Sequence, residues 1–197
     1  MSGNVTSTAD FYAENAEAYA SRGRTAHMER IQPFCARLAL GSRILELGCG
    51  GGEDSEAMLA LGFDVVPTDG SEALALLASK RLGRPVQVLL FDELDDVAAY
   101  DGIWANACLL HAPREDLPGI LHRIRRALRP AGLFYASYKI GGPEGLDRFG
   151  RYFNRPEPAW LERVYRDAGW SEIASEMAAG DGYAGEQTEW LHVTAGA

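Results

Sequence analysis

Ile44-Leu45-Glu46-Leu47-Gly48-Cys49-Gly50-Gly51-Gly52 is the stretch of this sequence that decides its fold. The apolar residues before Gly48 are typical of a parallel strand that is buried on both faces. Glycine at positions 48, 50 and 52 lets the backbone turn sharply and approach a ligand closely at the carboxyl end of that strand. The stretch therefore predicts a buried strand that runs into a ligand-binding loop.

The spacing of the glycines separates two classes of nucleotide-like ligand. The dinucleotide fingerprint G-x-G-x-x-G, started at Gly48, requires a third glycine where this chain has Glu53. Glu53 and Asp54 also open the next expected helix, so the positive end of its dipole faces carboxylates rather than a phosphate. The motif favours a ligand without phosphates.

The same residues resemble the glycine motif of the class I S-adenosylmethionine-dependent methyltransferases. That motif, E/D-x-G-x-G-x-G, is matched in full by Glu46, Gly48, Gly50 and Gly52. The resemblance implies S-adenosyl-L-methionine as the cofactor and methyl transfer by direct displacement to a small-molecule acceptor. It also implies an α/β fold, a Rossmann-like three-layer sandwich whose seven-stranded sheet is mostly parallel with an antiparallel last strand.

Helix and strand patterns alternate along the chain, which indicates a largely parallel sheet with helices on both faces. Strands are expected to begin near residues 43, 64, 85, 101, 132, 172 and 189, and Pro67 suggests that the second pairs only as far as Val66. Helices are expected over about 53–61, 72–82, 116–128 and 157–168. No domain boundary stands out, so we predict a single methyltransferase domain over 1–197, with 1–40 as an N-terminal helical cap.

Length, composition and charge are those of one globular enzyme domain. The 197 residues are 47% hydrophobic and 24% charged, and the net charge of -9 argues against a nucleic-acid partner. The longest mostly apolar run, residues 103–110, is too short to span a membrane. Three widely spaced cysteines without a CxxC pair favour a reducing compartment and predict no metal site. We expect a cytoplasmic monomer or homodimer that binds neither nucleic acid nor membrane.

Acidic residues at the ends of the second and third expected strands are candidate cofactor ligands. Asp69, followed by Gly70 and Ser71, lies where a ribose diol would find a bidentate acceptor, although it could instead cap a helix. In the resembled family, the acid after the third strand accepts a hydrogen bond from the adenine amino group and its neighbour packs on the ring. Asp92 and Phe91 hold those positions. Without the glycine motif, a core Phe91 and a helix-capping Asp92 would be the simpler interpretation.

The end of the fourth strand and the N-terminal segment complete the cofactor site that the resemblance implies. His111 falls at its mouth and is our candidate catalytic base, because histidine titrates near neutral pH; a purely structural role is an equal alternative. Arg24 with Tyr19 is expected to hold the methionine carboxylate. The full set of predicted cofactor-binding residues is Tyr12, Tyr19, Arg24, Glu46, Gly48, Cys49, Gly50, Asp69, Gly70, Ser71, Phe91, Asp92, Asn106 and Ala107.

The acceptor pocket is expected after the fourth and fifth strands, and its aromatic content suggests a small, partly apolar acceptor. Aromatic side chains are as often core as pocket, so these positions are hypotheses. The predicted acceptor-binding residues are Tyr138, Lys139, Tyr152, Phe153 and Trp190. Two alternative functions stay open: a Rossmann-type NAD-dependent oxidoreductase, disfavoured by the missing glycine, and a non-catalytic S-adenosylmethionine-binding protein.

Overall fold

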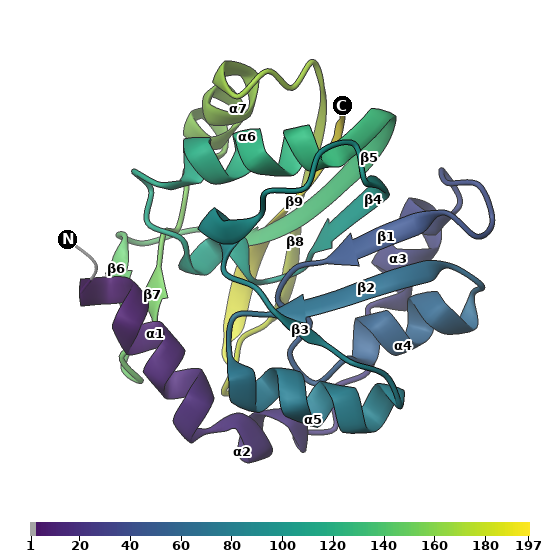
Figure 1. The fold of residues 1–197 in the computed structure, drawn as a ribbon. Helices are drawn as coiled ribbons and strands as arrows, with labels where there is room; N and C mark the ends of the chain where they lie inside the picture. The colour runs from purple at the N-terminus through teal and green to yellow at the C-terminus, as the bar shows by residue number, and fades with distance from the viewer. Residues whose placement is uncertain (1–2) are drawn as a thin grey trace.

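A seven-stranded sheet in the order β3-β2-β1-β4-β5-β9-β8 runs through the middle of the protein (Figure 1). The computed structural model describes residues 3–197, with side chains from Thr8 onward, so Met1 and Ser2 of the expected cap lie outside it. β9 runs antiparallel to both of its neighbours, and the other pairs are parallel. The fold class is therefore confirmed. The strands are β1 (Arg43–Glu46), β2 (Asp64–Asp69), β3 (Gln87–Val88), β4 (Tyr100–Ala105), β5 (Leu128–Lys139), β8 (Glu172–Asp181) and β9 (Gln187–Gly196).

Alternating side chains of the central strands supply the two halves of the core. Leu45, Ile103 and Phe134 are in register across β1, β4 and β5 and belong to one buried cluster. The residues next to them on these strands belong to the second cluster. Among these, the rings of Trp104 and Tyr135 stack with their centroids 4.0 Å apart. A strand that is apolar at successive positions is thus covered on both faces.

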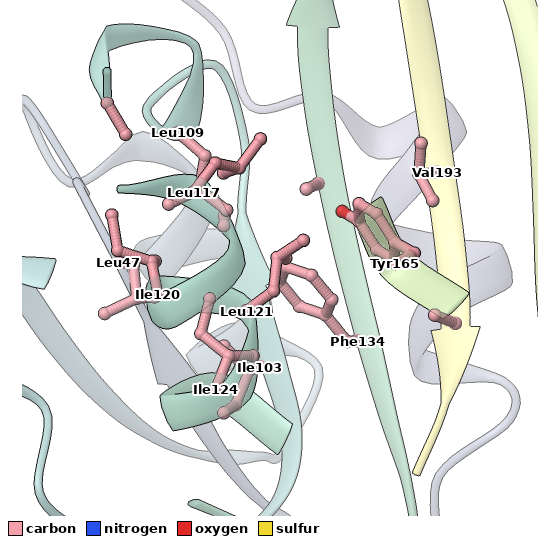
Figure 2. Packing of buried hydrophobic residues seen from close by; sticks show 14 of the residues in the cluster. Leu47, Ile103, Leu109, Leu117, Ile120, Leu121, Ile124, Phe134, Tyr165 and Val193 are labelled. Atoms are coloured by element: carbon pink, nitrogen blue, oxygen red, sulfur yellow. The ribbon is translucent and has the colours of Figure 1, made fainter. Parts of the chain in front are cut away.

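Helices form the two outer layers of the sandwich. α6 (Leu117–Ala127) and α7 (Pro158–Asp167) cover one face, and α3 (Met28–Cys35) and α4 (Glu53–Ala60) cover the other (Figure 1). The apolar residues of α6 recur at helical spacing and point at the sheet, where Figure 2 shows them against Ile103 and Phe134. α5 (Glu72–Leu82) packs on β2.

The N-terminal helices lie at the carboxyl ends of the strands (Figure 1). α1 (Gly3–Glu14) and α2 (Ala16–Ala20) contact α5, and α1 also contacts the short hairpin of β6 (Gly145–Leu146) and β7 (Tyr152–Phe153) at its second strand. Two 3-10 turns, η1 (Phe91–Glu93) and η2 (Leu109–His111), follow β3 and β4. Among residues 3–197, no helix has the length and apolar character needed to cross a bilayer.

Two expected strand boundaries are wrong. β2 continues through Pro67, which is in register with Glu46, because β3 reaches only Thr68 and Asp69 and leaves the other side of Pro67 unpaired. The third strand is also much shorter than its apolar run, since the chain turns into η1 directly after Leu90.

Candidate active site

The glycine loop after β1 leaves no room for side chains. Gly48, Gly50 and Gly52 have φ of 68°, 58° and 89°, the left-handed region that favours glycine. A Cβ on Gly48 would lie 2.5 Å from the Cβ of Cys108, and one on Gly50 would lie 3.2 Å from the ring of Tyr19. The loop is therefore pressed between the end of β4 and the N-terminal cap.

Asp69 at the end of β2 braces this loop. Its two carboxylate oxygens accept hydrogen bonds from the backbone N–H groups of Gly50 and Ser71, each at 2.8 Å. Burial raises the pKa of Asp69 to about 6, against the lowering effect of these two hydrogen bonds. The side chain of Ser71, not that of Asp69, caps α5, and each Asp69 oxygen keeps a lone pair for a ligand.

A cavity of about 580 Å³ opens at the carboxyl ends of β1 and β4. In the strand order 3-2-1-4 the chain reverses its direction across the sheet between these two strands, which is where open α/β sheets bind ligands. The cavity is lined by the loops after β1 to β4, by α1 and α2, and by the start of α6. It brings together eleven of the predicted residues: Tyr12, Tyr19, Gly48, Gly50, Asp69, Gly70, Ser71, Phe91, Asp92, Ala107 and His111.

His111 at the end of η2 is neutral, and its tautomer is fixed by its neighbours. Nδ1 lies 2.6 Å from the backbone oxygen of Tyr152, which only accepts, so Nδ1 carries the hydrogen. Nε2 therefore accepts a hydrogen bond from the Tyr12 hydroxyl at 3.0 Å. Burial, together with the charge of Arg151, lowers the pKa of His111 to about 3. The cavity thus contains an unprotonated imidazole nitrogen with a single donor on it.

Four predicted cofactor residues do not line the cavity. The Arg24 guanidinium lies 3.4 Å from the Tyr19 hydroxyl. Glu46 is buried and accepts a hydrogen bond from Ser55, and burial holds its pKa well above the usual range. The other two are Cys49 and Asn106. Both are buried, and they form their hydrogen bonds with residues inside the fold.

None of the predicted acceptor residues lines the cavity. Tyr138 is fully buried in the core beside α7, away from the cavity, and its hydroxyl lies 3.0 Å from that of Tyr165. Lys139 pairs with Glu186 at 3.3 Å. The Lys139 ammonium lies 5.1 Å from the ring centre of Phe153 and 5.5 Å from that of Trp190. Tyr152 donates its hydroxyl hydrogen to Glu144.

Sequence reasoning named Tyr12 of α1 but missed the other wall residues that α1 and α6 supply. Thr8 and Ala9 of α1 line the cavity, as do Gly119 and Ile120 of α6. No motif marks them. The only signal was that α6 follows the β4 loop directly, which places its first turns beside any ligand there.

The cap is fastened from the far end of the chain. The guanidinium of Arg22 lies 4.0 Å from the ring centre of Tyr19 and 4.2 Å from that of Tyr183, and the two rings stack at 6.0 Å. Tyr183 belongs to the turn between β8 and β9. Cation–π contacts of this kind hold α2 over the glycine loop.

The fold, the glycine motif and the acid after β2 agree with a comparison of this chain with known protein families. Residues 17–167 match the family model described as methyltransferase domain. The chain belongs to this family. It has a class I S-adenosylmethionine-dependent methyltransferase domain, and the nicotinamide-dependent alternative is set aside.

Curated relatives of this methyltransferase match over part of their length. It is 34% identical over 116 residues to the ubiquinone biosynthesis O-methyltransferase of Xanthomonas campestris pv. campestris (strain B100), covering 55% of this chain and 48% of the relative. It is 35% identical over 100 residues to the cypemycin N-terminal methyltransferase of a Streptomyces species, covering 47% and 40%. The chain spans about half the length of the curated relatives it matches.

Solved structures share the fold of this methyltransferase. The Burkholderia thailandensis 1,6-didemethyltoxoflavin-N1-methyltransferase, with bound 1,6-didemethyltoxoflavin and S-adenosylhomocysteine, has a TM-score of 0.77 at 24% identity, covering 97% of this chain and 87% of that one. Phosphoethanolamine N-methyltransferase 2 of Haemonchus contortus, in complex with S-adenosyl-L-methionine, has a TM-score of 0.71 at 15% identity, covering 100% and 57%.

The cavity of this methyltransferase fits S-adenosylmethionine. Gly48 and Gly50 present bare backbone, and a side chain at Gly48 would clash. Asp69 has free lone pairs for two hydroxyl donors, while Phe91 and Asp92 offer an apolar ring and an acceptor carboxylate at the other end. Among residues 3–197, no group of His, Cys, Asp and Glu side chains could hold a metal ion.

Proposed function

We propose that this methyltransferase transfers the methyl group of S-adenosylmethionine to a small-molecule acceptor that binds beside His111. The observation that carries this proposal is the size and lining of the cavity: about 580 Å³, with α1 and α2 forming part of its wall. After the cofactor has taken the part between Phe91 and the glycine loop, the space near Tyr12 and His111 suits a small molecule rather than a folded chain. The names of the ubiquinone biosynthesis, didemethyltoxoflavin and phosphoethanolamine methyltransferases support the same class of acceptor, whereas that of the cypemycin N-terminal methyltransferase points to a peptide terminus.

Cofactor binding is assigned residue by residue. Asp69 would accept from the two ribose hydroxyls, the backbone of Gly48 and Gly50 would lie against the cofactor's chain, and Asp92 would accept from the adenine amino group while Phe91 packs on the ring. Tyr19 and Arg24 would hold the methionine carboxylate, because the guanidinium stands behind the Tyr19 hydroxyl at 3.4 Å.

The acceptor would be activated by orientation and by a weak base. The bound cofactor supplies a methyl group already activated by the sulfonium, so the protein must hold the nucleophile in line with it. Nε2 of His111 would accept the hydrogen bond of the acceptor O–H or N–H in place of Tyr12. For an O–H acceptor, methylation produces an oxonium whose proton is far more acidic than the imidazolium, so the proton passes to Nε2 although the pKa of His111 is about 3. A methylated amine would keep its proton, and His111 would then only orient the N–H.

The whole chain is proposed to act as one unit. We propose a single methyltransferase domain over 1–197, with residues 1–40 as its cap, working as a cytoplasmic monomer or homodimer without nucleic acid. The contacts of α1 and α2 with α5 and of α1 with β7 support the role of the cap.

Calorimetric titration followed by methyl transfer tests the proposal. The protein should bind S-adenosylmethionine and S-adenosylhomocysteine at micromolar concentration and NADH not at all. Labelled S-adenosylmethionine is then incubated with small hydroxyl and amine acceptors, and in parallel with protein and RNA. Label in the small molecules alone supports the proposal. Label only in a macromolecule would reject the acceptor class, and binding without any transfer would favour the non-catalytic alternative.

A further inference from the structure

A chain of buried hydrogen bonds ends on the wall of the cavity at Ala107. The backbone N–H of Ala107 donates to the Ser137 hydroxyl at 2.8 Å, and that hydroxyl donates to Oδ1 of Asn106 at 2.7 Å. The side-chain amide of Asn106 in turn donates to Oδ2 of Asp54 at 3.0 Å. Asn106, Ser137 and Asp54 are all buried, and none of their side chains lines the cavity.

The direction of this chain is fixed by its last member. Asp54 is ionised: although burial raises its pKa, hydrogen bonds from His27 and Asn106 and the charges of His27 and Arg24 hold it well below the usual range. A carboxylate only accepts, so Asn106 must turn its NH₂ group to Asp54 and its oxygen to Ser137. The Ser137 hydrogen is then used on Asn106, which leaves its oxygen lone pair for the N–H of Ala107.

Ala107 is the residue that needs such a partner. Its φ is 55°, in the left-handed region that a residue with a Cβ seldom adopts. It lies between Asn106 and Cys108, and the Cβ of Cys108 limits the space over Gly48. A relaxed Ala107 would therefore change the wall at the point where the loops after β1 and β4 meet.

We propose that Ser137 and Asp54 are positioning residues that hold the cavity-lining Ala107 peptide in its left-handed conformation for cofactor binding. This inference rests on the proposed function, because it takes the cavity to be the cofactor site. Neither residue touches the ligand. Both act through the backbone of Ala107, Ser137 directly and Asp54 through Asn106.

Glycine at position 107 separates positioning from a general structural role. Glycine adopts positive φ without cost, so Ala107→Gly should make the Ser137 hydrogen bond dispensable. The matched control is Ser79→Ala, because Ser79 also accepts a backbone N–H, that of Val86 at 2.9 Å, and lies outside the cavity wall.

The experiment measures the Kd for S-adenosylhomocysteine, the melting temperature and the exchange rate of the Ala107 amide hydrogen. Ser137→Ala should weaken binding about tenfold and expose the Ala107 amide, Ser79→Ala should leave binding unchanged, and Ser137→Ala with Ala107→Gly should regain most of the affinity. Asp54→Asn should weaken binding in the same direction as Ser137→Ala.

Three results would overturn the positioning role. They are unchanged binding and amide protection in Ser137→Ala, a loss of binding that Ala107→Gly fails to restore, and a loss that only follows the melting temperature. Failure of the proposed function looks different, because the unaltered protein would then not bind S-adenosylhomocysteine; the positioning role would fall with it.

Discussion

Asp69 is the residue at which the sheet, the glycine loop and the cavity meet. One carboxylate oxygen of Asp69 accepts a hydrogen bond from the backbone N–H of Gly50 and the other from that of Ser71. A second lone pair on each oxygen is left for a ligand in the cavity. Burial makes the ionised form of the Asp69 carboxyl unfavourable until a ligand donates hydrogen bonds to it. Affinity for the cofactor is therefore expected to depend on both the presence and the ionisation of this carboxyl group.

Asp69→Asn should weaken the binding of S-adenosylhomocysteine by about tenfold to a hundredfold, because hydrogen bonds to a charged acceptor contribute about 1.5–3 kcal/mol. Titration calorimetry measures the change. Asp64→Asn is the matched control, since Asp64 lies at the opposite end of β2 and is exposed. Equal affinities of the protein and Asp69→Asn would remove Asp69 from the ribose site.

The pH dependence of binding follows from the raised pKa of Asp69. With a value of about 6, affinity should be about tenfold weaker at pH 5 than at pH 7, because the protonated carboxyl accepts poorly. The stability of the unliganded fold should change with pH in the opposite direction. Because the pKa of Asp69 is raised on folding, this group stabilises the folded state below pH 4, and that stabilisation is lost as pH rises through 6. Calorimetry from pH 5 to 8 checks the affinity, and Asp69→Asn should flatten the profile.

At the scale of elements, local signals predicted the helices and long-range contacts decided the rest. α4 was expected over 53–61 and runs over 53–60, because Gly62 with its φ of 90° stops it. The glycine loop and the position of Asp69 were likewise predicted from short segments of sequence. Tyr138 shares the face of β5 that carries Phe134 and Ala136, and its hydroxyl contacts Tyr165 of α7, a partner that neighbouring residues do not encode.

The glycine loop allows a test that separates backbone strain from loss of space. Gly48→Ala and Gly83→Ala both place a Cβ at positive φ, at 68° and 62°, and each should lose about 1–2 kcal/mol of stability. Only the first meets Cys108, since nothing lies within 4 Å of the second. Gly48→Ala alone should therefore abolish binding of S-adenosylhomocysteine, as calorimetry and thermal melting would show. If Gly83→Ala weakened binding as much as Gly48→Ala, the loss of binding would not come from the lack of space at Gly48.

At the scale of the whole molecule, ligand binding in the cavity should stabilise the fold, because several helices and loops together form the cavity wall. S-adenosylhomocysteine at a hundred times its Kd should stabilise the protein by about 2.7 kcal/mol. For a domain of this size the melting temperature should rise by about 5–10 °C. A thermal melt with and without the ligand measures the shift, with NADH as the control. No shift at saturation would mean that the ligand binds the unfolded chain equally well or binds nowhere.

The overall architecture was predictable because the three layers follow from the alternation of helix and strand patterns, and the mostly parallel seven-stranded sheet follows from the family motif. The closure of the site was not. The contact of Arg22 with Tyr183 joins residues 161 positions apart, and no pattern in the sequence pairs them. Such contacts come from the shape of the finished sheet.

This distant fastening joins an early segment of the chain to one that is synthesised after most of the sheet. The strands that carry the glycine loop and Asp69 precede Tyr183, which lies in the turn between β8 and β9 and contacts Arg22 and Tyr19. The cation–π support of α2 by Tyr183 therefore cannot form until the β8–β9 turn has been synthesised, although the glycine loop that α2 covers is encoded far earlier.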